Sequence, residues 1–266
     1  MQIAYDVYAE RIERASTIRQ FGQVTQVVGL VVESAGPSVP IGRLCQIENR
    51  DDGTRMKAEV VGFRDNRILL MPYGPLSGIT PGAIVTSTSE QLRVPVGDEL
   101  IGRILGGFGQ PIDNRGPLNC ARTRAITAQS IPVLSRRRIT QPLRTGIKAI
   151  DLLTPVGQGQ RMGIFAGSGV GKSVMLGMMS RGTSADVNVI ALVGERGREV
   201  REFIERDLGP EGLKRSVVVA VSSDEPALVR IKGAMTATTI AEYFRDQGKN
   251  VLLLMDSVTR IAMAQR

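Results

Sequence analysis

The segment with the clearest chemistry is the glycine-rich run AGSGVGKS. Its members are Ala166, Gly167, Ser168, Gly169, Val170, Gly171, Lys172 and Ser173. An apolar run precedes it, and a run typical of a helix begins at Val174. We expect Val174 to contact the nucleotide as well. Glycines let the backbone curl so that successive N–H groups face an anion, and the helix adds the positive end of its dipole. The spacing predicts a phosphate-binding loop, with Lys172 reaching the β- and γ-phosphates of ATP and Ser173 ligating Mg²⁺.

A second chemical group is the carboxylate that ends the apolar run VLLLMD, residues 251–256. This pattern predicts Asp256 at the carboxyl end of a buried strand, where ligands of a doubly wound sheet bind. There Asp256 can hold a magnesium-bound water opposite Ser173. A strand that ends in Asp is weak support by itself, but together with the loop 84 residues upstream it becomes good support.

A third group, GERGRE, follows the apolar run 187–193 and therefore leaves the sheet at the same edge. A carboxylate at this position can polarise the water that attacks the γ-phosphorus. Glu195 is the first charged residue after the run and is our candidate for this catalytic role. A solvated turn with local ion pairs explains the sequence GERGRE equally well. The residues alone therefore leave two interpretations open, a catalytic Glu195 and a solvated turn.

Composition limits the available chemistry. The chain has 266 residues, of which 42% are hydrophobic and 23% are charged, so we expect a packed core. It contains no His, so catalysis must use carboxylates, Lys, Arg and an oxygen-held metal. Cys45 and Cys120 are expected to be free thiols. No apolar run is long enough to cross a bilayer, and we expect a cytoplasmic protein.

The positive charge is uneven. Residues 121–160 hold seven basic side chains and a single acid, Asp151, within a chain of formal net charge +8. Such a stretch fits a solvated linker or a surface that meets an acidic partner. Aromatic residues are few, with six Phe, four Tyr and no Trp, so no base-stacking surface is expected and nucleic acid is the weaker choice of partner.

The elements around these motifs form four expected regions. Residues 1–20 have apolar side chains at helical spacing and predict an amphipathic helix. Residues 21–93 contain short β-type runs (24–32, 44–47, 57–63, 68–71 and 83–86) between turn signals, which predicts a small barrel or sandwich. Residues 94–150 form a basic lead-in. Residues 151–266 place apolar runs (162–165, 187–193, 216–221 and 251–255) between helical stretches, which predicts an α/β P-loop core with a parallel sheet.

Taken together, three motifs resemble one family: AGSGVGKS, GERGREV and VLLLMDSVTRIAMAQR. The phrases VPVGDELIGRILGGFGQPID and TGIKAIDLLTPVGQGQRMGIFAGSGVGKSVMLGMMSR are similar to that family as well. From about residue 22 to residue 266 the chain resembles the export ATPases of the bacterial flagellum and of type III secretion injectisomes. These enzymes are related to the catalytic subunit of rotary ATP synthases.

The resemblance implies a RecA-like P-loop ATPase core after a small β-barrel domain, in an ATPase that uses ATP and Mg²⁺ and energises protein export. It implies a cytoplasmic homohexamer, peripheral at the inner membrane, without nucleic acid. Export-gate, stalk and regulator proteins, export substrates and chaperones would be its partners. By matching motifs, Glu195 would be the catalytic glutamate and Arg196 a γ-phosphate contact. Glu199 would orient magnesium-bound water, and Arg260 would position the γ-phosphate side of the site.

Members of this family extend well past the strand that ends at Asp256, whereas this sequence ends at Arg266. We therefore expect an incomplete core without the arginine supplied in trans and without the C-terminal helical domain. Such an arginine can change phosphoryl-transfer rates by roughly a thousandfold or more. The 266-residue chain by itself is expected to bind Mg-ATP weakly, hydrolyse it very slowly and not close a hexamer.

Three alternatives stay open at this point. A rotary ATP synthase catalytic subunit is the nearest, and the segment after Asp256 favours the export family over it. A hexameric nucleic-acid motor would need a stacking surface on the β domain, where Phe63 and Tyr73 are too few to supply one. A non-enzymatic nucleotide-binding scaffold is the third. ATP turnover measured with and without RNA separates the last two.

Overall fold

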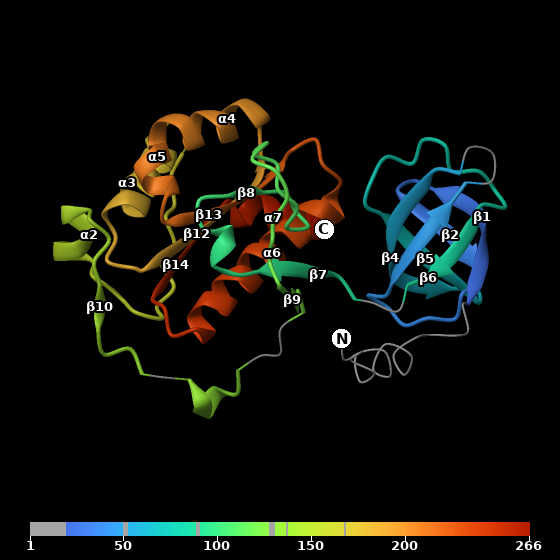
Figure 1. Ribbon diagram of the computed structural model, residues 1–266, viewed down its shortest axis with the longest axis horizontal. Coiled ribbons are helices and arrows are strands. Elements are labelled where there is room, and N and C mark those ends of the chain that lie inside the picture. Colours follow the sequence, from blue (N-terminus) through green and yellow to red (C-terminus); the bar gives the residue numbers. More distant parts are fainter. Residues whose placement is uncertain (1–19, 50–52, 89–90, 128–130, 137, 168) are drawn as a thin grey trace, which may run out of the picture. The chain divides into compact units, whose positions relative to one another are not determined.

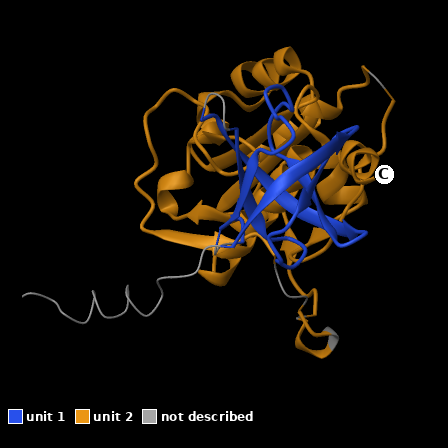
Figure 2. Ribbon diagram, turned by 90° about the vertical axis from the view of Figure 1, so that its right-hand side faces the viewer, with its two compact units in different colours: residues 1–92 blue, residues 93–266 orange. Residues whose placement is uncertain are grey.

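The computed structural model describes residues 20–266 except 50–52, 89–90, 128–130, 137 and 168. The helix predicted over 1–20 lies outside the described residues, apart from residue 20. The chain divides into two compact units, Met1–Leu92 and Arg93–Arg266 (Figures 1 and 2). No helix among the described residues combines the length and apolar character needed to cross a membrane.

The first unit is a closed six-stranded antiparallel barrel with strand order β1-β2-β5-β4-β3-β6. Its strands are β1 (Phe21–Val28), β2 (Val31–Ala35), β3 (Leu44–Glu48), β4 (Arg55–Arg64), β5 (Arg67–Pro72) and β6 (Ile84–Ser87). Inward-facing side chains such as Val32, Val60, Leu70 and Val85 are fully buried and fill the interior. The predicted small barrel is therefore confirmed, and the predicted single strand 24–32 is wrong. The chain reverses inside it, so that Val28 faces Val31 across a hairpin.

The second unit is built on a parallel sheet with strand order β14-β12-β13-β8. Its strands are β8 (Ile104–Leu105), β12 (Val187–Glu195), β13 (Ser216–Ser222) and β14 (Val251–Asp256). In the central register Val189 pairs with Val217 on one side and with Leu253 on the other. Parallel strands of this kind are buried on both faces, which is why they read as continuous apolar runs. The predicted α/β class is confirmed.

Helices cover both faces of this sheet. On one side α6 (Ala227–Asp246) packs Ile240 and Phe244 against Val189, and α7 (Val258–Gln265) adds to the same face. On the other side α3 (Lys172–Gly182), a π-helix (Phe203–Leu208) and α5 (Gly209–Leu213) pack around Ile190. Neighbouring residues of β12 point to opposite faces, so one strand serves both cores.

Shorter elements complete this unit. They are β7 (Arg93–Val96), η1 (Asp98–Leu100), β9 (Arg122–Ala125), η2 (Val133–Ser135), β10 (Pro142–Leu143), α2 (Lys148–Leu153), β11 (Val156–Gly157) and α4 (Gly197–Glu202). Residues 94–150, which the sequence suggests as a lead-in, fall within the second unit. They also supply β8 to its sheet, where Ile104 pairs with Val218. A two-residue strand carries too little pattern to be recognised in a sequence.

The strand predicted over residues 162–165 is wrong. These residues form no strand, and the Phe165 side chain is 96% exposed. An apolar run becomes a strand only where a neighbouring strand offers hydrogen-bonding partners. Within the described residues the sheet ends at β14, and residues 162–165 pair with none of its strands.

Candidate nucleotide site

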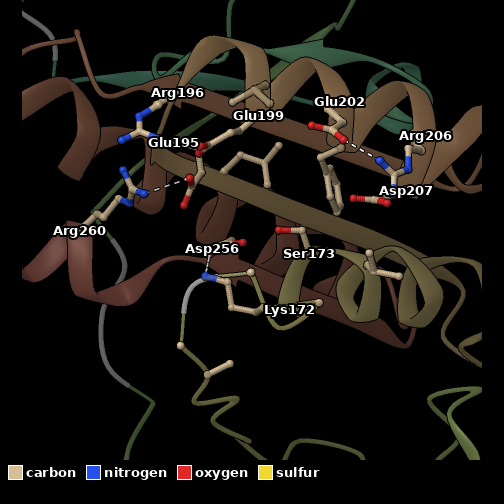
Figure 3. Close-up of a pocket in the computed structure, with 18 residues that line it drawn as sticks. Lys172, Ser173, Glu195, Arg196, Glu199, Glu202, Arg206, Asp207, Asp256 and Arg260 are labelled. Carbon is tan, nitrogen blue, oxygen red and sulfur yellow. Dashed lines mark hydrogen bonds and ion pairs between the residues drawn. The ribbon is translucent and has the colours of Figure 1, made fainter.

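The site lies where two strands and one helix of the second unit end or begin. Strand β12 ends at Glu195, strand β14 ends at Asp256 and helix α3 begins at Lys172. Because β12 and β14 run parallel, their carboxyl ends meet at one edge of the sheet. Figure 3 shows the three side chains facing a common space, with α4 and the π-helix on its far side. The topology therefore assembles motifs that are far apart in the sequence.

This space is a cavity of about 660 Å³. Most of the predicted site residues line it: Ala166, Gly167, Gly169, Gly171, Lys172, Ser173, Val174, Glu195, Arg196, Glu199, Asp256 and Arg260. Val170 is 68% exposed and is not among the lining residues, and Ser168 lies outside the described residues. Gly171 caps α3 in the left-handed conformation at φ 93°, which favours glycine and lets the loop turn directly into the helix.

Lys172 and Asp256 form a short ion pair at the sheet edge. Lys172 Nζ lies 2.5 Å from Asp256 Oδ1. The side chain of Asp256 is only 5% exposed, whereas that of Lys172 is 32% exposed and borders the cavity. The lysine predicted to meet phosphates and the carboxylate predicted to hold a magnesium-bound water are therefore in contact with each other here.

Glu195 is held by Arg260 from the start of α7. Arg260 Nη2 donates to Glu195 Oε2 at 3.1 Å, and Arg260 Nη1 donates to the carbonyl oxygen of Gly194. Gly194 has φ 73°, and a Cβ at this position would lie 2.9 Å from Arg260 Cδ. The glycine therefore lets the arginine pack close enough to contact both the backbone and the carboxylate. Arg260 orients Glu195 in this structure.

Glu195 and Glu199 share a hydrogen bond that separates their acidities. Burial is the largest cause that raises the pKa of Glu195 to about 7, the bond to Glu199 adds to the rise, and Arg260 opposes it. The same bond lowers the pKa of Glu199. Of the two, Glu195 is the weaker acid, and with a pKa of about 7 a substantial fraction of it is ionised near neutral pH and able to accept a proton.

Arg196 is the most exposed of the predicted catalytic residues. Its Nη1 lies 3.1 Å from Glu199 Oε1, and its side chain is 67% exposed. Arg196 is the residue directly before α4, and it lines the cavity. An exposed pair of this kind is weak. Arg196 is therefore able to turn toward an anion in the cavity at little cost.

Sequence reasoning missed one wall of the cavity. Besides Glu199, the lining residues Glu202, Phe203, Arg206 and Asp207 come from α4 and the π-helix. They lie three, four, seven and eight residues after Glu199, the helical spacing that predicts a shared face. Arg206 Nη1 pairs with Glu202 Oε1 at 2.7 Å.

This wall sits directly on helix α3. A Cβ at Gly177 would collide with the backbone oxygen of Asp207, so only a glycine allows α3 and the π-helix to approach this closely. Gly177 is buried in α3, in the turn after Ser173. The contact sets how far the wall of α4 and the π-helix stands from the phosphate loop.

The oxygen donors of the cavity fit Mg²⁺. Ser173 and Asp256 both line it, and the Asp256 carboxylate already holds a cation, the ammonium of Lys172. No group of three or more His, Cys, Asp or Glu side chains suited to a metal occurs among the described residues. Mg²⁺ commonly takes one or two protein oxygens and completes its shell with phosphate and water. The donor set therefore suits a metal that arrives with a nucleotide.

Comparison with known proteins agrees with this geometry. Residues 146–266 match the nucleotide-binding domain of the ATP synthase alpha/beta family. Residues 24–89 match the beta-barrel domain of the same family. The first match contains all three motifs of the site, and the second coincides with the barrel unit.

The similar proteins are longer than this chain. The flagellum-specific ATP synthase of Bacillus subtilis (strain 168) is 55% identical over 257 residues, which cover 96% of this chain and 58% of that protein. The type 3 secretion system ATPase of Xanthomonas euvesicatoria is 50% identical over 248 residues, which cover 93% of this chain and 56% of that protein. The chain thus spans less than two thirds of the curated relatives it matches.

A solved structure shows the same fold. The assembled ATPase EscN, in complex with its central stalk EscO from the type III secretion system of enteropathogenic E. coli, matches with a TM-score of 0.84. It is 44% identical, and the match covers 92% of this chain and 60% of that one. With both of its units matched, the chain belongs to the ATP synthase alpha/beta family and is similar to the flagellum-specific and type 3 secretion ATPases within it.

Proposed function

We propose that this protein binds ATP with Mg²⁺ and hydrolyses it to energise protein export through a flagellar or type III secretion apparatus. One observation carries the proposal: the phosphate loop, Glu195 and Asp256 border one cavity at the carboxyl edge of a parallel sheet. The names of the similar proteins, flagellum-specific ATP synthase and type 3 secretion system ATPase, support the biological role.

The loop and Lys172 hold the nucleotide in this proposal. Backbone N–H groups of the loop and the N-terminus of α3 face the phosphates, and Lys172 Nζ leaves Asp256 to reach the β- and γ-phosphate oxygens. The Ser173 hydroxyl and the Asp256 carboxylate would hold Mg²⁺. Bound there, the metal supplies positive charge beside the phosphates as the γ-phosphoryl group is transferred.

Glu195 acts on water. Its carboxylate accepts a proton from a water molecule as the water oxygen bonds to the γ-phosphorus, and the bond from the γ-phosphorus to the bridging oxygen of ADP breaks. A pKa of about 7 places the group close to the pH at which a general base works best. Arg260 keeps the carboxylate aimed at the cavity, while Arg196 turns toward the γ-phosphate. Glu199 would orient water beside the metal.

We propose that the assembled protein is a cytoplasmic homohexamer, peripheral at the inner membrane, that binds a stalk protein. The assembled EscN structure and its complex with the stalk EscO support the ring and the stalk. Export-gate and regulator proteins, chaperones and export substrates are the remaining proposed partners.

Steady-state ATP turnover, measured with and without Mg²⁺ and with and without RNA, tests the function. The proposal predicts turnover that requires Mg²⁺ and does not respond to RNA. Stimulation of turnover by RNA would favour a nucleic-acid motor, and nucleotide binding without turnover would favour a scaffold.

A further inference from the structure

Helix α4 and the π-helix follow each other without a break, and together they touch two parts of the site. Near the start of α4, Glu199 shares a hydrogen bond with Glu195 at the end of β12. Near the end of the π-helix, Asp207 lies against Gly177 of α3. Helix α3 itself begins at Lys172, in the phosphate loop. The wall of α4 and the π-helix therefore connects the carboxylate pair to the helix that follows the loop.

The contact at Gly177 leaves no room for a side chain. A Cβ at this position would collide with the carbonyl oxygen of Asp207 and lie 2.7 Å from its carbonyl carbon. Both atoms belong to the backbone, so they cannot turn aside as the end of a flexible side chain could. Around the contact, Leu176 of α3 belongs to the same buried cluster as Phe203 and Leu208 of the π-helix. A side chain at position 177 must therefore push the π-helix away from α3.

Local helix preference does not explain a glycine at this position. Gly177 is buried in the interior of α3, where glycine is the least favourable residue after proline. The close approach of the π-helix does explain it, because only a residue without a Cβ permits that approach. Turns of π-helix are rare and are found mostly at functional sites. The seat of the π-helix on α3 is therefore a feature of the site as well as of the core.

We propose that Gly177 is a positioning residue that sets the distance between the nucleotide phosphates and the carboxylates Glu195 and Glu199. Figure 3 shows Glu199 across the cavity from Lys172 and Ser173. Helix α3 presents the phosphates from one side, and the wall seated on Gly177 presents Glu199 from the other. A misplacement of about 1 Å in such an arrangement can slow a reaction by roughly a hundredfold. This inference rests on the proposed function and adds a residue that does not line the cavity.

The first test compares the wild type with Gly177→Ala in single-turnover hydrolysis at saturating Mg-ATP. Hydrolysis by the folded variant should be slower by roughly tenfold or more, because the wall is displaced. Its affinity for Mg-ADP should stay within about threefold of the wild type, because the loop and the start of α3 are unchanged. Hydrolysis at the wild-type rate would overturn this inference alone, whereas a wild type without any hydrolysis would contradict the proposed function.

Gly182→Ala is the matched control for the first test. Gly182 is the last residue of the same helix, and a Cβ there would lie 3.1 Å from Gly146 Cα. The variant therefore crowds a backbone neighbour of α3 away from the wall, and neither glycine lines the cavity. Its hydrolysis and its affinity should match the wild type. An equal loss of hydrolysis in the two variants would overturn the proposal, since any crowding of α3 would then suffice.

A second test asks whether Gly177 acts through Glu195. Glu195→Gln removes the carboxylate that the wall helps to position, so in this background Gly177→Ala should slow hydrolysis by less than about threefold. A merely structural role would lower the rate by the same factor in both backgrounds and would overturn the proposal. Urea unfolding of each variant gives the folded fraction by which its rate is divided.

Leu208→Val tests the same contact from the side of the π-helix, and it keeps the proposal testable if Gly177→Ala does not fold. Leu208 is fully buried and does not line the cavity, so the change loosens the seat of the π-helix without crowding it. Hydrolysis per folded chain should fall by about fivefold, with the affinity for Mg-ADP within about threefold of the wild type. An unchanged rate per folded chain would overturn the proposal.

Discussion

Each unit of the molecule buries a carboxylate that is paired with another side chain. The partners of the barrel carboxylate lie on neighbouring strands, whereas the partner of the carboxylate in the second unit borders a cavity. In the barrel, Glu33 accepts hydrogen bonds from Gln26 Nε2 at 2.9 Å and from Arg67 Nη1 at 3.3 Å, and these residues lie on neighbouring strands of a closed sheet. In the second unit, Asp256 pairs with Lys172, which borders a cavity. A buried carboxylate fixed between strands contributes to the fold, whereas one whose partner borders a cavity can exchange that partner for a ligand.

The two sheets explain this difference. A closed antiparallel barrel has strand ends at both rims and no single edge at which loops of one kind collect. A parallel sheet brings all its carboxyl ends to one edge, so the residues that follow its strands converge there. If this account is right, turnover should be sensitive to the second unit and insensitive to the polar pairs of the barrel.

The largest effect on turnover is expected for Lys172→Ala. Losing the ammonium removes a charge that stabilises the transferring phosphates, and the rate should fall by roughly a thousandfold. Lys57→Ala is the matched control, because Lys57 is an exposed lysine of barrel strand β4. Its turnover should equal that of the wild type. A Lys172→Ala rate within a few-fold of the wild type would show that the loop does not hold the phosphates.

Glu195→Gln should have the next largest effect. Hydrolysis should fall by roughly a hundredfold, the scale of a lost general base, with little change in nucleotide affinity. Glu205→Gln provides the control, because this exposed glutamate pairs with Arg201 and does not line the cavity. If Glu195→Gln also abolished nucleotide binding, Glu195 would be a structural residue and Glu199 the better candidate for the base.

A smaller effect is expected from pH. The pKa of Glu195 is raised to about 7, and only its ionised form accepts a proton. Turnover should therefore rise with pH and level off above about 7, with a rate at pH 6 about tenfold below the plateau. A pH–rate profile of single-turnover hydrolysis measures this. A profile that stays flat between pH 5 and 8 would show that another group limits the reaction.

No effect on turnover is expected from Tyr73→Phe in the barrel. Tyr73 Oη donates to Glu59 Oε2 at 2.5 Å, and burial is the largest cause that raises the pKa of this tyrosine. Losing the bond should lower the free energy of unfolding of the barrel by about 1–3 kcal/mol. Urea unfolding checks the stability, and parallel turnover assays check the absence of a catalytic effect. Reduced turnover at unchanged folded fraction would contradict the separation of roles between the units.

Local patterns in the sequence were sufficient to predict the barrel, the parallel sheet and the motifs at its edge. The runs that became β12, β13 and β14 are apolar throughout because both of their faces are buried. The loop was predictable because its chemistry needs contiguous residues, from Gly167 to Ser173.

What could not be predicted depends on partners distant in the sequence. The apolar run 162–165 has the pattern of a strand but forms none. A strand needs a neighbouring strand as its hydrogen-bonding partner, and the local sequence does not specify that neighbour. The wall at Glu202 and Asp207 depends on how closely the π-helix packs on Gly177. The Lys172–Asp256 contact likewise arises from tertiary structure, between motifs 84 residues apart.

The most direct test of the central claim is equilibrium binding of Mg-ATP to the wild type and to Lys172→Ala, measured side by side by calorimetry. The claim is that the cavity beside α3 holds the nucleotide phosphates. The account predicts saturable binding of one Mg-ATP per wild-type chain and an affinity reduced by roughly a hundredfold or more in the variant. Equal affinity in the two proteins would contradict it.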